Sequence, residues 1–245
     1  MLTDPLFWLV AIPAVLITGI SKSGFAGGVG GLTVPLLALA ISPATAAAIM
    51  LPLLIYMDFL SVRSWWGQHN TRQLWILLPA AIVGIVIAYL LFDSLNEAYL
   101  KAILGVVSLG FGLYGLVLGD KSQATPSATI GRLCGLTAGF TSFVAHAGGP
   151  PLNAYLIPLK LPKSEFLATA VMFFAVVNWV KLIPYSLLGQ INEGNILISI
   201  LLAPLAWLGV KLGLVIQQKI SDRLFKKIIL ILMVLVGLRL LMSIY

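Results

Sequence analysis

The stretch SFVAHAGGPPLNAY, residues 142–155, decides the fold of this chain, because it sets two adjacent glycines and two adjacent prolines in an apolar neighbourhood. Glycine and proline interrupt helices, and one histidine, His146, stands just ahead of them. An unpaired backbone group that faces lipid costs several kcal/mol, so a break at membrane depth is tolerated only against protein or a water-filled cavity. In a membrane protein, this break must point inward.

The composition is that of an integral membrane protein. Of the 245 residues, 60% are hydrophobic and only 9% are charged, whereas roughly a quarter of the residues of soluble domains are charged. Uncharged runs at residues 74–92, 102–119 and 194–210 approach or reach the roughly 20 residues that a helix needs to cross a bilayer core. Residues 6–20 lack the basic start and cleavage pattern of a signal peptide, so we expect this segment in the mature protein.

The net charge and the cysteine count exclude several other classes. Fifteen Lys and Arg against eight Asp and Glu give a net charge of +7, but the basic residues cluster mainly in short loops between apolar segments. Membrane topology explains that pattern better than a nucleic-acid partner does. The single cysteine, Cys134, excludes an internal disulfide and offers no metal-ligand set. We interpret it as a small packing residue.

The apolar segments form two series with the same order, in which two short segments flank a Gly-rich break and three long ones follow. The first series is 6–22, 31–41, 44–62, 74–92 and 99–118, and the second is 130–147, 152–159, 165–188, 195–216 and 225–244. We therefore predict an all-α polytopic membrane protein of two repeats, residues 1–120 and 130–245. A cytoplasmic linker at 121–129 joins them.

Residue matches support the repeat more in pattern than in letters. GFAGGVGGLTVPLL at 24–37 faces GFTSFVAHAGGPPLNAYL at 139–156, since both begin with Gly-Phe and both reach Gly-Gly and Pro. Trp66-Gly67-Gln68 can be set against Leu188-Gly189-Gln190, at an offset of about 121 or 122 residues.

The positive-inside rule assigns the loops to the two sides of the membrane, because Lys and Arg in short loops mark the cytoplasm. The basic loops hold Arg63 and Arg72, then Lys121 and Arg132, and finally Lys219, Arg223, Lys226 and Lys227. The loops near Glu97 and Glu193 carry almost no basic residues and are predicted to be periplasmic, as are both termini. The two halves then have opposite orientations, which is the inverted-repeat plan of many secondary transporters.

The short second arms, 31–41 and 152–159, fall well under the length needed to span a bilayer. We expect helical hairpins that enter partway and turn back, although fully spanning, tilted arms would give the same sidedness.

Each break can form an anion site without a charged side chain, because a restarting helix presents free N–H groups and its positive dipole end. Close packing of neighbouring helices is the alternative reason for the glycines, and Gly24, Gly27 and Gly28 fit it equally well. At the pairs Gly30-Gly31 and Gly148-Gly149, the adjoining prolines and the repeat favour anion binding over packing. The backbone candidates are Gly27, Gly28, Gly30, Gly31, Pro35, Gly148, Gly149, Pro150, Pro151 and Asn153.

Five polar residues inside the apolar segments narrow the site, because ionisable groups in a bilayer usually face a pathway or a partner. Lys22 lies at the first break, Asp58 in the third segment and His146 at the second break. Asn178 and Lys181 are three residues apart on one helix face, where an amide and a cation suit an oxyanion. An imidazole ordinarily titrates near neutral pH, so His146 is also a candidate proton carrier.

Three of these residues have a structural alternative. Lys181 can snorkel to an interface, Asp58 can pair with a structural cation, and His146 can be a satisfied core histidine. Lys211 and Arg239 are assigned to snorkelling.

These residues resemble the TauE/SafE sulfite exporter family of membrane permeases, and the resemblance covers nearly the whole chain. Its most specific stretch is HAGGPPLNAYLIPLKLPKSEFLATAVMFFAVVNWVKLIPYSLLGQ at 146–190, and GFAGGVGGLTVPLLAL at 24–39 is less specific. The resemblance implies transport of small sulfur-containing anions such as sulfite, sulfonates or sulfoacetate, mainly outward, across a bacterial inner membrane. It carries over the Gly-rich breaks, His146, Pro150, Pro151, Asn178 and Lys181 as site positions, whereas Lys22 rests on its location alone.

The leading hypothesis is a secondary transporter with no bound cofactor, driven by a proton or ion gradient. An anion-selective channel is the nearest alternative, since the same helix-end site conducts when it binds weakly enough. An intramembrane serine protease using Ser21 or Ser23 with His146 is disfavoured, because GISKSG lacks the GxSG arrangement and HExxH is absent. A structural subunit has little reason to break its helices twice, and the sequence leaves a homodimer open.

Overall fold

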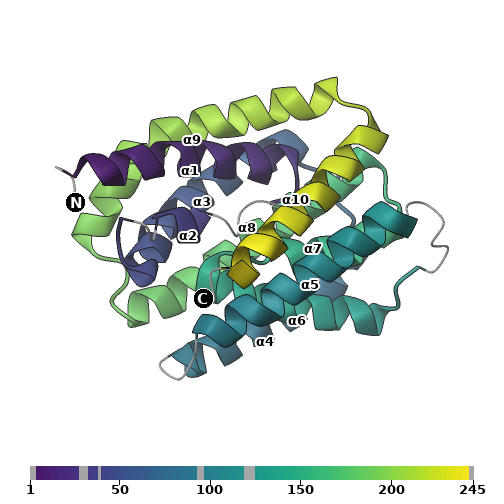
Figure 1. The fold of residues 1–245 in the computed structure, drawn as a ribbon, viewed down its shortest axis with the longest axis horizontal. Coiled ribbons are helices and arrows are strands. Elements are labelled where there is room, and N and C mark those ends of the chain that lie inside the picture. Colours follow the sequence, from purple (N-terminus) through teal and green to yellow (C-terminus); the bar gives the residue numbers. More distant parts are fainter. Residues whose placement is uncertain (1–3, 28–32, 38–39, 93–96, 119–124, 243–245) are drawn as a thin grey trace.

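The structure of the protein is a computed structural model that describes residues 4–27, 33–37, 40–92, 97–118 and 125–242. Within these ranges the regular structure is helical and contains no strand, which confirms the predicted all-α class. Figure 1 shows that several of the long helices run from one end of the molecule to the other.

The described helices follow the predicted order. The first series is α1 (Pro5–Gly24), α2 (Thr33–Leu37), α3 (Pro43–Trp65), α4 (Thr71–Leu90) and α5 (Glu97–Leu118). The second is α6 (Ala128–Ala145), α7 (Gly149–Leu156) with the 3-10 turn η4 (Ile157–Leu159), α8 (Lys163–Leu187), α9 (Glu193–Lys219) and α10 (Asp222–Met242). Among the described residues, α1, α3, α4, α8 and α9 are long and apolar enough to cross a membrane.

The turns that follow α3 and α8 are built alike. Gly67 and Gly189 both take a positive φ, of 80° and 67°, just past the ends of these helices, a conformation that glycine adopts without a steric penalty. Three residues later, Asn70 and Asn192 cap α4 and α9, and each side chain accepts a hydrogen bond from a first-turn N–H. The match between the Trp-Gly-Gln and Leu-Gly-Gln triplets therefore marks equivalent turns.

Two helix pairs join segments that are far apart in sequence, and each pair is parallel. A Cβ added at Gly19 would lie 2.9 Å from the backbone of Gly209, and one added at Gly24 would lie 2.5 Å from that of Gly213. Residue numbers thus rise together along α1 and α9. Gly135 and Gly139 of α6 lie in the same way against Leu77 and Ala81 of α4. Glycine allows such close backbone contact between membrane helices.

The pair α5 and α10 is antiparallel instead. Gly105 lies against Gly237 and Leu241, whereas Gly112 lies against Leu230 and Val234, so residue numbers run in opposite directions. In Figure 1 these two helices cross the front of the molecule. Buried Val236 of α10 packs with Ala147 and Ala145 at the second break, so α10 covers that break.

The two breaks close with the same hydrogen-bond pattern. At the first, the Gly27 N–H donates to the Ser21 carbonyl at 3.0 Å, and at the second the Ala147 N–H donates to the Thr141 carbonyl at 3.2 Å. The residue before each donor, Ala26 or His146, takes the left-handed conformation, with φ of 51° and 52°. Residues other than glycine rarely adopt this backbone conformation outside special sites.

The Gly-Phe match between the halves does not mark equivalent positions. Gly24-Phe25 lies at the C-terminal end of α1, whereas Gly139-Phe140 lies inside α6, several residues before its end. Gly139 is needed instead where α6 contacts the Ala81 backbone.

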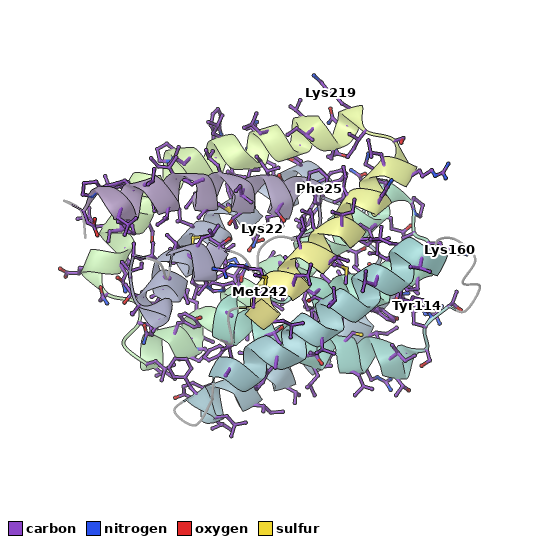
Figure 2. The ribbon with its side chains drawn as sticks, viewed as in Figure 1. Lys22, Phe25, Tyr114, Lys160, Lys219 and Met242 are labelled. Atoms are coloured by element: carbon purple, nitrogen blue, oxygen red, sulfur yellow. The ribbon has the colours of Figure 1, made fainter. Side chains whose placement is uncertain are left out.

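The basic ends of several helices lie on one side of the molecule. The Lys163 ammonium at the start of α8 donates to the carbonyls of Gln217 and Ile220 at the end of α9. The Asn70 amide after α3 donates to the Glu165 carboxylate at 2.6 Å. Figure 2 shows Lys219 and Lys160 toward this end, and Lys22 in the interior.

Candidate functional site

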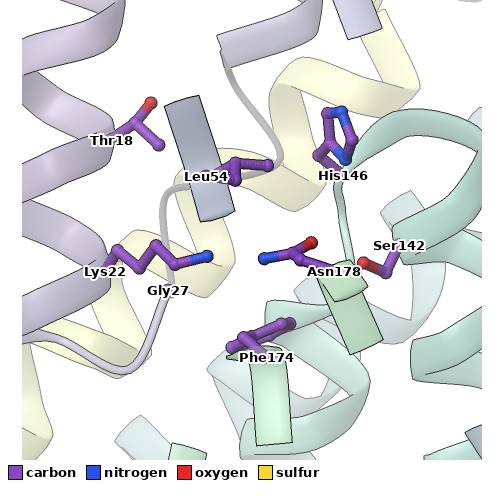
Figure 3. Close-up of a pocket in the computed structure, with 8 residues that line it drawn as sticks. All are labelled: Thr18, Lys22, Gly27, Leu54, Ser142, His146, Phe174 and Asn178. Carbon is purple, nitrogen blue, oxygen red and sulfur yellow. The ribbon is translucent and has the colours of Figure 1, made fainter. Parts of the chain in front are cut away.

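A small cavity lies where α1, α3 and α8 meet the two breaks. It contains about 320 Å³ of empty space, part of which is open at its mouth. Its polar lining is Thr18, Lys22, Ser142, His146 and Asn178, and its apolar lining is Gly27, Leu54 and Phe174. Figure 3 shows Lys22 and Asn178 pointing toward one another from α1 and α8. The polar lining suits a small polar ligand.

A buried ion pair forms one side of the site. The Lys22 ammonium lies 2.8 Å from Oδ1 of Asp58, and the Asn178 amide donates to Oδ2 at 2.7 Å. Lys22 is 5% exposed and Asp58 is 1% exposed. The Lys22 ammonium also lies 5.7 Å from the centre of the Phe174 ring, within the range of a cation–π contact.

A second buried cation holds the end of α6. The Lys181 ammonium donates to the Ser142 carbonyl at 2.9 Å and the Ser142 hydroxyl at 3.0 Å, and it lies 2.8 Å from Nδ1 of His146. A lysine ammonium has three N–H donors, so these three contacts use all of them. Positive charge is favourable at a helix C-terminus, and Lys181 therefore fixes the broken helix end.

The partners of His146 determine which ring nitrogen carries its proton. Nε2 lies 2.9 Å from the Ala47 carbonyl, which can only accept, whereas Nδ1 faces the Lys181 ammonium, which can only donate. The imidazole is thus assigned as neutral with its proton on Nε2. The ring also stacks on Tyr185, with centres 6.1 Å apart, and the Tyr185 hydroxyl donates to the Phe143 carbonyl at 2.6 Å.

The formal charges of this buried cluster do not cancel. In their usual ionised forms Lys22 and Lys181 are cations, Asp58 is a carboxylate and His146 is neutral, so the basic groups outnumber the acidic ones by one among residues that are almost fully buried. A buried charge is costly unless it is paired. The cluster therefore favours an anion over a cation in the cavity.

The protein-family model described as Sulfite exporter TauE/SafE matches residues 11–240. The chain belongs to the TauE/SafE family. Comparisons with curated proteins and with solved structures gave no match. Family membership and the apolar helices identify the protein as a multi-pass membrane transporter. Its family consists of sulfur-anion transporters and is not a family of enzymes.

The structure brings some of the predicted site residues of this TauE/SafE protein together. Lys22, Gly27, His146 and Asn178 line the cavity, and Lys181 contacts two lining residues without lining it. Gly148, Gly149, Pro150, Pro151 and Asn153 are buried in and before the first turns of α7 and do not line it. Gly28, Gly30 and Gly31 lie outside the described residues, and Pro35 lies in α2 with its side chain outside them.

Four lining residues were not predicted, namely Thr18, Leu54, Ser142 and Phe174. A signal was present for the two polar ones, because Thr18 lies four residues before Lys22 and Ser142 four residues before His146. Residues four apart share a helix face.

The structural alternatives have separate outcomes. The alternative prediction that Lys181 snorkels to an interface is wrong, because the side chain is fully buried and contacts three partners. Asp58 does pair with a cation, Lys22, and both nitrogens of His146 are bonded as in a satisfied core histidine. The exposed side chains of Lys211 and Arg239 are consistent with snorkelling.

Three further observations concern the other chemistries considered from the sequence. The Ser23 hydroxyl donates to the carbonyls of Gly19 and Val210, and His146 is bonded to Ala47 and Lys181. Ser23 and His146 therefore do not form a Ser–His pair. Cys134 is half-buried and packs against the core, as expected. Within the described part of the chain, no three His, Cys, Asp or Glu side chains gather as metal ligands.

Proposed function

We propose that this TauE/SafE protein is a secondary transporter that exports small sulfur-containing anions, such as sulfite, a sulfonate or sulfoacetate, across a bacterial inner membrane. The observation that carries the proposal is the excess of basic over acidic side chains beside the cavity, where Lys22 and Lys181 are accompanied by one acid, Asp58. An anion in the cavity would lie beside this excess of basic groups.

The donors beside the cavity suit an oxyanion. Asn178 gives one amide hydrogen to Asp58 and has a second. The Ser142 oxygen accepts from Lys181, so its own hydrogen can be donated. Lys22 has three N–H groups and lies against Asp58 with one side of its ammonium. Hydrogen bonds from a charged donor to an anionic oxygen are roughly twice as strong as neutral ones.

Alternating access between two inverted repeats, residues 1–120 and 130–245, is the mechanism we propose. The helix pairing supports it: α1 runs parallel to α9 and α4 runs parallel to α6, while α5 and α10 are antiparallel. This pattern is expected when a two-fold axis in the membrane plane relates α1–α5 to α6–α10. The cavity then lies where the halves meet, since α1 and α3 belong to one half and α8 to the other.

The orientation we propose places the basic end of the molecule in the cytoplasm and both termini in the periplasm. The support is that Lys160, Lys163 and Lys219 lie toward one end. Reporter fusions at Gln123 and Glu193 should report cytoplasm and periplasm respectively, and the same side for both would exclude the inverted topology. The transport cycle needs no bound cofactor, and a homodimer is compatible with it.

Counterflow in proteoliposomes tests the function and separates it from an anion-selective channel. Vesicles loaded with unlabelled sulfite, thiosulfate, methanesulfonate or sulfate are diluted into a trace of the labelled anion. A carrier gives transient, saturable accumulation of label, whereas a pore gives none. The double variant Lys22→Gln/Asp58→Asn removes both charges of the ion pair and should abolish counterflow. Lys219→Gln, at the exposed end of α9, should retain it; absence of counterflow for every anion would refute the proposal.

A further inference from the structure

Asp58 holds the donors that an incoming anion needs. Its Oδ1 faces the Lys22 ammonium and its Oδ2 accepts from the Asn178 amide. Lys22 and Asn178 both line the cavity, whereas Asp58 does not. The carboxylate, which lies outside the cavity lining, therefore binds the same two donors, Lys22 and Asn178, that an oxyanion in the cavity would bind.

An anion and the Asp58 carboxylate cannot share Lys22 without a penalty. Both are negative, and a like charge within a few ångströms in a buried site strongly favours protonation of one of them. A sulfonate or sulfate does not take up a proton near neutral pH, so the proton goes to the carboxylate. Binding of the anion and protonation of Asp58 then favour one another, as linkage requires.

His146 is poorly placed for the proton. Its Nδ1 faces the Lys181 ammonium at 2.8 Å, and its Nε2 is engaged with the Ala47 carbonyl. A second proton would direct an N–H of the ring at an N–H of Lys181. The contacts of Lys181 with Ser142 hold the ammonium in that position.

The other charged groups around Asp58 are limited. Among the elements that pack against α3, Lys22 of α1 and Lys181 of α8 act on the carboxylate. His146, after α6, faces Lys181. The short helix α2 has no titratable side chain, and Lys211 of α9 is exposed. The remaining charged residues of α8 and α9 lie near the helix ends.

We propose that the transported anion displaces the Asp58 carboxylate from Lys22 and that Asp58 takes up one proton in the same event. Anion and proton then occupy the site together. This inference rests on the proposed transport function and adds the identity of the proton-binding group.

The exchange balances without any covalent change in the anion. The carboxylate gains a proton from water on the open side and becomes a carboxylic acid. Lys22 stays an ammonium and exchanges one oxygen acceptor for another, while the Asn178 bond to Oδ2 is compatible with both forms of Asp58. With a monoanion the total charge of the site is unchanged, because the added anion and the added proton cancel.

The coupling determines what drives transport. A monoanion that moves with a proton carries no net charge, so the membrane potential does not act on the loaded step. In a cell with an alkaline interior the proton gradient opposes outward movement. Export through this site is therefore driven by the excess of the anion inside the cell.

Calorimetric titration of the purified protein tests the proposal. The probes are methanesulfonate and sulfate, which keep their charge near neutral pH, and buffers of different protonation enthalpy give the number of protons taken up. We expect one proton per bound methanesulfonate in the wild type, with affinity rising as pH falls. In Asp58→Asn we expect no uptake and tighter, pH-independent binding. His146→Gln changes a residue that lines the cavity and should alter the affinity, but each methanesulfonate that binds should still take up one proton.

A transport experiment gives a second readout. In Asp58→Asn, an imposed pH gradient should no longer drive accumulation, while anion exchange continues. If the variant folds poorly alone, sulfate should rescue it, because the anion replaces the missing counter-ion. Equal pH dependence in Asp58→Asn and wild type, binding without proton uptake, or failure of both probes to bind a protein that shows sulfite counterflow would each overturn the proposal. Absence of all counterflow in the wild type would instead refute the transport function.

Discussion

Removing one member of the Lys22–Asp58 pair should be far more damaging than removing both. In Lys22→Met, the Asp58 carboxylate stays 1% exposed and keeps only the Asn178 amide as a partner. Breaking a buried ion pair in this way costs about 3–5 kcal/mol, whereas replacing both charges by neutral groups is often close to neutral. We therefore expect Lys22→Met to lose about 3–5 kcal/mol of unfolding free energy, and Lys22→Met/Asp58→Asn to recover most of it.

A double-mutant cycle measures this coupling. Reversible unfolding in detergent micelles, followed by tryptophan fluorescence, gives the free energy of unfolding for the wild type, both single variants and the double variant. Groups in direct contact show interaction energies of roughly 0.5–3 kcal/mol, and this pair should lie at or above the top of that range. Lys219→Met is the control, because an exposed substitution usually changes stability by less than about 0.5 kcal/mol. If the losses of the two single variants add up to that of the double variant, the two charges are not coupled and the description of the site is wrong.

Two glycine substitutions test the packing and the first break. Gly139→Ala places a Cβ against the α4 backbone and should destabilise the protein by about 1–3 kcal/mol. At Gly110, the control, a Cβ meets nothing within 4 Å, and Gly110→Ala should be neutral or stabilising by up to about 1 kcal/mol. Equal free energies of unfolding for the two variants would contradict the close α4–α6 contact. Gly27→Ala adds a Cβ 3.1 Å from the Phe174 ring at a φ of 69° and should reduce counterflow. Gly67→Ala has a positive φ but open space, and a similar loss of counterflow there would show that backbone strain, and not the cavity wall, is responsible.

The order of the helices was predictable from the sequence because it depends on local properties. Long uncharged runs have one stable form in a bilayer, a helix, and the observed helices lie within a few residues of the predicted segments. The turn glycines Gly67 and Gly189 were also predictable, since each stands in a similar triplet at the end of a long apolar run.

The partners within the site were not predictable from local pattern. Lys22 and Asp58 are both intramembrane charges, but nothing in their spacing indicates that they meet. Lys181 and Asn178 share a helix face as predicted, but the three acceptors of Lys181 come from another helix and from the break after it. The Gly-Phe match misled because glycine serves a helix end at Gly24 and a helix contact at Gly139.

The parallel packing of α1 on α9 and of α4 on α6 has a consequence for protein fragments. Each of these close glycine contacts joins a helix of residues 1–120 to a helix of residues 130–245. A chain divided between α5 and α6 would give two pieces, each with the glycine faces of its helices unmatched. Neither piece has a complete interior alone, but two co-expressed pieces retain every surface they need to find one another. Complementation between separate halves, and not independent folding of either, is the behaviour that this architecture implies.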